Sequence, residues 1–110
     1  MESVFARLSS AARPVVVSTS EKMTYILDDM WEKFRERFPR GKLHGAALDE
    51  ENKLLLAVDE VVYDADVLTP QDAKRFEGPL EALLRILENQ GDKEFVNDLL
   101  EHLRRDVARL

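Results

Sequence analysis

Residues 18–38 read STSEKMTYILDDMWEKFRERF and carry the clearest periodic pattern in the chain. Placed 100° apart, the apolar side chains of this stretch fall within an arc of about 140°, as on an α-helix that packs along one side. They are Met23, Ile26, Leu27, Met30, Trp31, Phe34 and Phe38. Ser18 and Glu21 have the spacing of a capping box, and Pro39-Arg40-Gly41 provides a stop. We therefore predict a long helix that forms the main apolar surface of the fold, with Tyr25 on its polar face.

The composition indicates one globular domain spanning residues 1–110. Hydrophobic residues make up 45% and charged residues 35% of the chain, and no apolar run approaches the roughly 20 residues that span a bilayer. The absence of Cys excludes disulfides, thiolate nucleophiles and Cys-type zinc sites. Because the first residues lack a secretory signal pattern, we expect a soluble, cytoplasmic protein. Scarce Asn and Gln, with Arg outnumbering Lys, are typical of thermophilic proteins.

The negative charge is concentrated in one segment. The chain has a net charge of −6, and residues 49–66 contain seven acids against the single base Lys53. The seven are Asp49, Glu50, Glu51, Asp59, Glu60, Asp64 and Asp66. Acids and bases balance over the rest of the chain, so this segment accounts for the whole net charge.

The first two thirds of the chain also contain short elements. The spacing of apolar residues predicts a helix over 2–12, and the β-branched run 15–17 after Pro14 predicts a buried strand. The apolar runs 43–48 and 54–58, joined by five polar residues, predict a β-hairpin. Residues 61–63 form either a third strand of this sheet or the continuation of the second past a bulge, and we favour the third strand.

The last third of the chain predicts a pair of helices. Thr69, Pro70 and Asp72 mark a helix start, and the apolar phase continues through Gly78-Pro79, which indicates a kinked helix or two nearly collinear pieces. We expect Gly91 to end this helix and Asp92 to cap the next. The second helix has a wide apolar stripe made by Phe95, Val96, Leu99, Leu100, Leu103, Val107 and Leu110. The two should form an antiparallel hairpin.

These elements predict an α+β fold in the order α-β-α-β-β-(β)-α-α. A small, mainly antiparallel sheet of three or four strands would pack against the long helix and the C-terminal helical hairpin. Both apolar stripes are wide for a domain of this size, which is compatible with a homodimer that shares part of this surface.

Three groups of polar residues are candidate sites. Asp64 and Asp66 would point the same way from a strand and could bind a divalent cation, with His44 nearby, although a solvent-facing turn explains them more simply. His102 lies one helical turn from Asp98 and from Asp106, an arrangement typical of a surface ion pair and open to general-base chemistry. Asp106 is anomalous because it falls within the apolar arc of its helix. The basic and aromatic run over residues 34–42 suggests nucleic-acid binding only weakly in so acidic a chain.

The leading functional hypothesis is a non-enzymatic interaction module. Its seven acids at 49–66 would contact a basic protein partner, and we expect no catalytic residues, cofactor, bound metal or membrane association. Ordinary protection of a sheet edge is the simpler explanation of the same charges. The alternatives are a small metal-dependent enzyme or sensor that uses Asp64 and Asp66, and nucleic-acid binding through residues 35–42.

Overall fold

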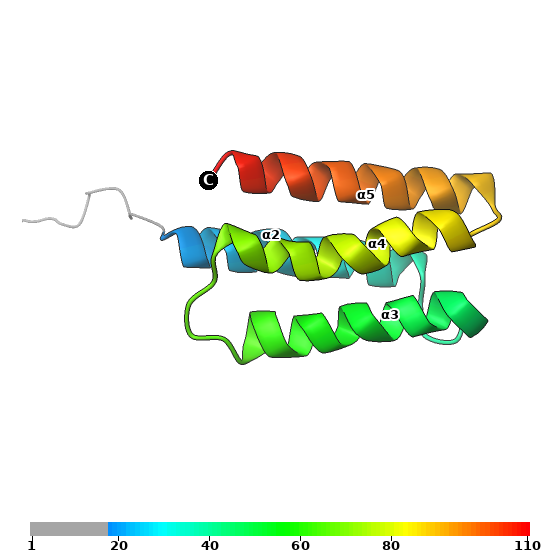
Figure 1. The fold of residues 1–110 in the computed structure, drawn as a ribbon, viewed down its shortest axis with the longest axis horizontal. Coiled ribbons are helices and arrows are strands. Elements are labelled where there is room, and N and C mark those ends of the chain that lie inside the picture. The colour runs from blue at the N-terminus through cyan, green and yellow to red at the C-terminus, as the bar shows by residue number, and fades with distance from the viewer. Residues whose placement is uncertain (1–17) are drawn as a thin grey trace, which may run out of the picture.

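Four α-helices form an up-down-up-down bundle in the part of the chain that the computed structural model describes, residues 18–110 (Figure 1). They are α2 (Thr19–Arg37), α3 (Gly45–Ala57), α4 (Lys74–Ile86) and α5 (Gln90–Ala108). Around the bundle, α2 packs on α5, α5 on α4 and α4 on α3, and the segment that follows α3 contacts α2 and closes the ring. The predicted helix over 2–12 and strand over 15–17 lie outside the described residues.

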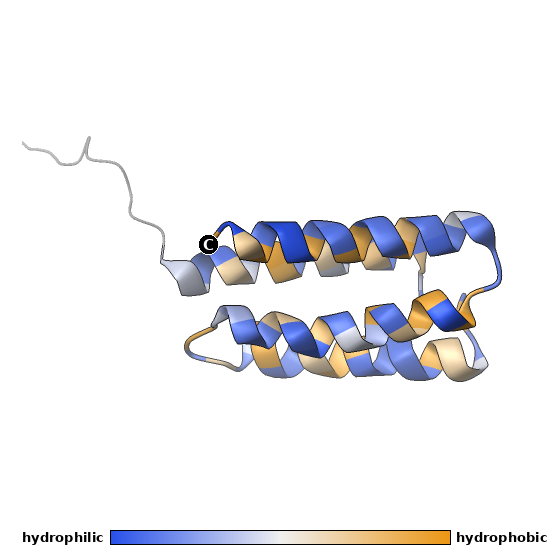
Figure 2. Ribbon diagram, turned by 45° about the horizontal axis from the view of Figure 1, so that its top comes forward, coloured by the Kyte–Doolittle hydropathy of each residue, from blue (hydrophilic) through white to orange (hydrophobic). Residues whose placement is uncertain are grey.

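The predicted α+β fold is wrong, because residues 18–110 contain no β-strand. Instead, apolar residues recur along every helix about once per helical turn, with polar residues between them (Figure 2). The apolar sides meet in one core that contains residues of all four helices. None of the helices in this part of the chain is both long and apolar enough to cross a lipid bilayer.

The predicted helix over residues 18–38 is confirmed as α2. The Ser18 hydroxyl accepts a hydrogen bond from the Glu21 backbone N–H at 3.1 Å, and the Glu21 carboxylate accepts one from the Ser18 N–H at 3.1 Å. This reciprocal arrangement satisfies two backbone donors that a helix start would otherwise leave unpaired. Tyr25 is 74% exposed, as its place opposite the apolar stripe predicts.

A row of aromatic rings fixes α2 against α5. Phe34 stacks on Trp31 with centroids 5.5 Å apart and meets Phe38 at 5.0 Å. Phe38 in turn contacts the edge of Phe95 on α5 at 6.0 Å. Since Phe34 and Phe38 are fully buried, this row forms the core at the end of α2.

The predicted hairpin over residues 43–58 is wrong, because α3 occupies this stretch. The side chains that α3 buries are Ala47, Glu51, Leu54 and Ala57, which follow one another at helical intervals. A charged residue at one of these core positions interrupts the apolar pattern and makes residues 49–53 resemble a turn. Yet Glu and Lys within that stretch, with Ala and Leu on either side, are good helix formers.

Glu51 is tolerated in the core because Arg35 of α2 reaches it. Arg35 Nη1 lies 2.8 Å from Glu51 Oε2, and the Glu51 side chain is only 5% exposed. The same guanidinium donates to the Phe38 carbonyl at 3.2 Å and lies 4.6 Å from the centre of the Trp31 ring. Arg35 Nη2 and Glu51 Oε1 are buried without a hydrogen-bond partner among residues 18–110. One nitrogen–oxygen contact of the pair is therefore well formed, whereas the second nitrogen of Arg35 and the second oxygen of Glu51 lack hydrogen bonds.

The predicted strand over residues 61–63 is also wrong. Residues Val58–Tyr63 form a π-helix, η1, that continues α3. Valine favours strands by its own preference. Here a helical turn instead buries Val58 and Val61, three residues apart, against α2. The loop that follows returns to the start of α2, where the Leu68 N–H donates to the Ser20 hydroxyl at 2.8 Å.

The predicted C-terminal helical hairpin is confirmed, with two corrections at its turn. Gly91 does not end the first helix, because α4 ends at Ile86 and Gly91 lies in the first turn of α5. The Thr69 N–H donates to the Asp72 carboxylate at 2.8 Å, and a 3₁₀ turn, η2 (Pro70–Ala73), leads into α4, which runs unbroken through Gly78 and Pro79. The cap of α5 is Asn89, whose side chain accepts from the Asp92 N–H at 2.9 Å. Asp92 is therefore not the cap and instead binds Arg37 of α2 at 3.0 Å.

The Arg35–Glu51 pair yields a stability prediction. Arg35→Met should reduce the free energy of unfolding by about 3 kcal/mol, the low end for breaking a buried pair, because it leaves the Glu51 carboxylate buried and unpaired. The double variant Arg35→Met with Glu51→Leu should recover most of this loss, since apolar residues of similar size often replace a buried pair at no net cost. Urea unfolding at neutral pH measures both. Equal losses in the single and double variants would contradict this account.

Candidate functional site

The seven acids predicted as a partner surface lie on α3, on η1 and in the turn after η1, and the structure divides them into two sets. Glu51 is buried with Arg35, Glu50 pairs with Lys53 at 3.1 Å, and Glu60 pairs with Arg75 of α4. The other four carboxylates, which make no ion pair with any residue of 18–110, are Asp49, Asp59, Asp64 and Asp66. All four are exposed.

Exposed apolar side chains accompany these free carboxylates. Leu56 is 55% exposed, Tyr63 is 65% exposed and Val67 is 71% exposed. Leu56 lies two helical turns after Asp49 and one turn before Asp59, so the three share the outer side of the α3–η1 helix. Tyr63 and Val67 directly adjoin the other two acids in the chain. We call this set of three apolar side chains and four carboxylates the acidic face.

The residues of the predicted cation site do not come together. His44 immediately precedes α3, whereas Asp64 follows η1. The 19 residues between them are all helical and so separate them by about 30 Å. Within residues 18–110, no three His, Asp or Glu side chains are grouped in a way that could hold a metal ion.

The basic run over residues 35–42 is largely engaged in the fold. Arg35 pairs with Glu51, and Arg37 pairs with Asp92 while its guanidinium lies 5.5 Å from the Phe95 ring. Lys42 lies 5.6 Å from the Phe38 ring. Arg35 and Arg37 thus join α2 to α3 and α5, and Arg40 is the member of the run that remains outside such contacts in residues 18–110.

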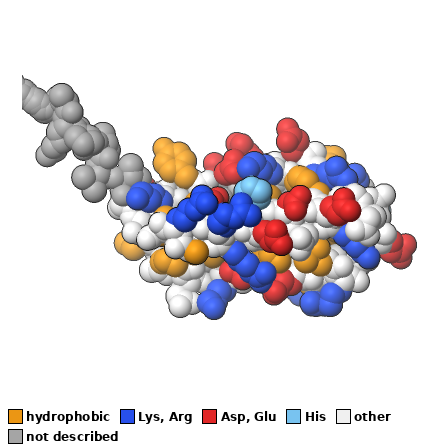
Figure 3. Space-filling model, turned by 90° about the horizontal axis from the view of Figure 1, so that it is seen from above, with side chains coloured by type: hydrophobic (Ala, Val, Ile, Leu, Met, Phe, Trp, Pro, Cys, Tyr) orange, Lys and Arg blue, Asp and Glu red, His pale blue; other side chains and the backbone are white. Residues whose placement is uncertain are grey.

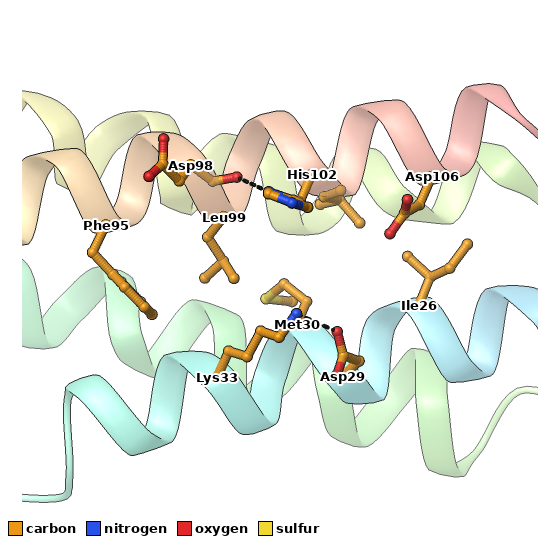
Figure 4. Close-up of a pocket in the computed structure, with 10 residues that line it drawn as sticks. Ile26, Asp29, Met30, Lys33, Phe95, Asp98, Leu99, His102 and Asp106 are labelled. Atoms are coloured by element: carbon orange, nitrogen blue, oxygen red, sulfur yellow. Dashed lines mark hydrogen bonds and ion pairs between the residues drawn. The ribbon is translucent and has the colours of Figure 1, made fainter.

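A groove of about 240 Å³ lies between α2 and α5 (Figure 4). Its floor is apolar and consists of Met30, Leu99 and Leu103, and Ile26 and Phe95 lie toward its two ends. The rim is polar, with Asp29 and Lys33 on α2 and three residues of α5, namely Asp98, His102 and Asp106.

The groove explains the anomalous place of Asp106 in the apolar arc of α5. At this level the two helices leave a hollow, so Asp106 lines the groove across from Ile26 and stays partly exposed. His102 does not pair with a carboxylate among residues 18–110; its Nδ1 lies 3.0 Å from the Asp98 carbonyl oxygen. A carbonyl only accepts, so Nδ1 carries the hydrogen. The sequence identified the α5 side of the rim, His102 with Asp98 and Asp106, but the groove itself was missed because its α2 side lies about 70 residues away in the chain.

The face that carries α5 has both signs of charge (Figure 3). Arg104 joins α5 to α4 by donating to Glu77 at 3.0 Å and to Glu81 at 2.7 Å. The hydrogen bonds to Glu81 and then Glu77 raise the pKa of Arg104, since both stabilise the charged guanidinium. The charge of Arg104 is thus balanced by two carboxylates of α4, in contrast to the free carboxylates of the acidic face.

Comparison of the chain with protein-family models, with curated proteins and with solved structures finds no match. Inference about its function therefore rests on the surfaces of the chain itself. Among residues 18–110 they offer two features, the acidic face and the groove between α2 and α5.

The exposed apolar residues of the acidic face should contribute little to folding. Each of Leu56→Ser, Tyr63→Ser and Val67→Ser should change the free energy of unfolding by no more than about 0.5 kcal/mol, as for other surface sites. The matched control, Val61→Ser in the same segment, should cost about 2 kcal/mol because it removes buried apolar contacts and buries a hydroxyl. Chemical unfolding measures all four. Similar losses at the exposed and buried positions would show that the exposed set is structural.

Proposed function

We propose that the protein is a non-enzymatic binding module and that the acidic face on α3 and η1 contacts a basic protein partner. The observation that supports this proposal most strongly is that exposed apolar side chains and free carboxylates lie in the same segment of the chain. Four large apolar side chains are more than half exposed in residues 18–110, and three of them, Leu56, Tyr63 and Val67, belong to the acidic face. These three lie within twelve residues of one another in the chain, and exposed apolar side chains beside charged ones are common at docking surfaces.

The charges on this face support a partner of opposite sign. Four carboxylates lack a protein cation among residues 18–110, and the segment that holds them accounts for the whole net charge of −6. Such a surface speeds association with basic partners and disfavours acidic ones. The apolar side chains would then supply the contact area that charge alone lacks. The expected partner is a protein segment in which Lys or Arg flanks Leu, Met or aromatic residues.

Peptide selection tests this chemistry directly. A displayed library of random peptides, selected on the intact protein at low salt, should yield sequences in which basic residues flank apolar ones. Binding of a selected peptide, followed by fluorescence anisotropy, should weaken steeply between about 0.05 and 0.5 M salt because the contributing charges are exposed.

Charge reversal identifies the face that binds. The triple variant Asp49→Lys, Asp59→Lys and Asp64→Lys should weaken binding of the selected peptide at least about tenfold, since attraction becomes repulsion. The control reverses three exposed acids elsewhere, Glu32, Glu36 and Glu88, to Lys, with the same change in net charge. Equal loss in both variants would mean that only overall charge matters, and unchanged binding in the first variant would remove the acidic face from the proposal.

A further inference from the structure

The groove between α2 and α5 has an apolar floor and half-buried apolar residues at both ends. Its floor residues Met30, Leu99 and Leu103 are almost fully buried, while Ile26 and Phe95 toward its ends are only half-buried. A helix laid along the groove would cover these two and complete an apolar seam. Acids outnumber cations on the rim.

The charges of the rim favour a basic occupant. Asp29 is neutralised by Lys33 at 2.9 Å. Asp98 and Asp106 form no ion pair with any residue of 18–110, and they stand two helical turns apart on α5. An occupant with two cations at a comparable spacing would satisfy both carboxylates.

Residues 2–12 of the same chain, with Arg13 after them, have the apolar spacing and the two cations expected of such an occupant. Apolar residues recur there at helical spacing, namely Val4, Phe5, Leu8, Ala11 and Ala12. Arg7 borders this stripe, and Arg13 follows the segment at an interval of six residues. The one acid within residues 2–12 is Glu2, so the segment is suited to an acidic rim.

The lengths of the connecting residues 13–17 and of the segment 2–12 also match the groove. Residues 13–17 can span up to about 17 Å when extended, and Ile26, toward the near end of the groove, lies about 12 Å along α2 from Ser18. As a helix, residues 2–12 would be about 16 Å long, the same as the stretch of α5 from Phe95 to Asp106. The segment can therefore turn back beside α2 and run the whole length of the groove.

We propose that residues 2–12 dock in the groove as a helix antiparallel to α2 (Figure 4). In this arrangement Phe5 and Leu8 lie on the apolar floor. Arg7 is level with Asp98 and His102, and Arg13 reaches Asp106. Any partner helix with a similar apolar stripe and basic residues would then have to displace residues 2–12 in order to bind the groove. This site is on other helices than the acidic face, so either proposal can fail alone.

A single spin label tests the docking, because the chain has no Cys of its own. In Ser10→Cys the label sits on the polar side of the segment, away from its apolar stripe. In the full-length, isotope-labelled protein it should broaden the amide signals of both groove walls, around Ile26 and around His102. The outer side of α3, around Asn52, should stay sharp. Broadening restricted to the first turn of α2 would overturn the proposal.

Three control samples test whether the broadening comes from docking within one chain. Adding Phe5→Asp and Leu8→Asp to the labelled chain should abolish the broadening around His102 and leave the fold of residues 18–110 intact, and so should Asp98→Lys with Asp106→Lys. A mixture of spin-labelled chain without isotope and isotope-labelled chain without spin label should show no broadening. Broadening in that mixture would assign the groove to a second copy of the chain and overturn docking within one chain.

Discussion

The ion pair between Arg35 and Glu51 is the contact on which the arrangement of the bundle depends. A carboxylate stands at a core position of α3, and burial of an unpaired charge would cost more than most single side chains contribute. The observed register of α3 against α2 brings the Arg35 guanidinium to it. The same guanidinium lies over Trp31 and binds the Phe38 carbonyl, so the pair also ties α3 to the aromatic row. The pair acts more as a constraint on register than as a source of stability.

That same pair explains which parts of the fold the sequence predicts. The helix over 18–38 and the C-terminal hairpin were predictable because their apolar stripes are long and almost unbroken, with Asp106 as the exception. The capping residues Ser18 and Thr69 also act locally. In α3, by contrast, Glu51 breaks the stripe, and its partner is 16 residues away in the chain. The valines of η1 added a local preference for strands that tertiary packing overrides. Weighing the helix formers across residues 46–56 would have favoured α3, whereas nothing local distinguishes a π-helix.

The candidate sites were predictable to different degrees. All seven acids of residues 49–66 were identified, but the sequence could not separate the paired Glu50, Glu51 and Glu60 from the free carboxylates, because the pairing depends on the helical form of the segment. Nor could it show that Leu56 and Tyr63 are exposed. The groove combines residues of two helices distant in the chain. Its α5 side was identified locally, because Asp98, His102 and Asp106 follow one another at helical intervals and Asp106 falls within an apolar arc.

The topology of the bundle separates the acidic face from the groove between α2 and α5. In an up-down-up-down ring with α5 beside α2 and α4, α3 occupies the opposite side of the bundle (Figure 1). Nearly all of the acidic segment belongs to that one helical stretch, whereas Arg104 is matched by Glu77 and Glu81 on the α4–α5 side. The net charge is therefore displaced toward one side, and a basic partner would be oriented toward α3 as it approaches. A helix in the groove would meet apolar contacts and two carboxylates instead. One small bundle thus has room for a docking surface governed by charge and a second governed mainly by apolar fit.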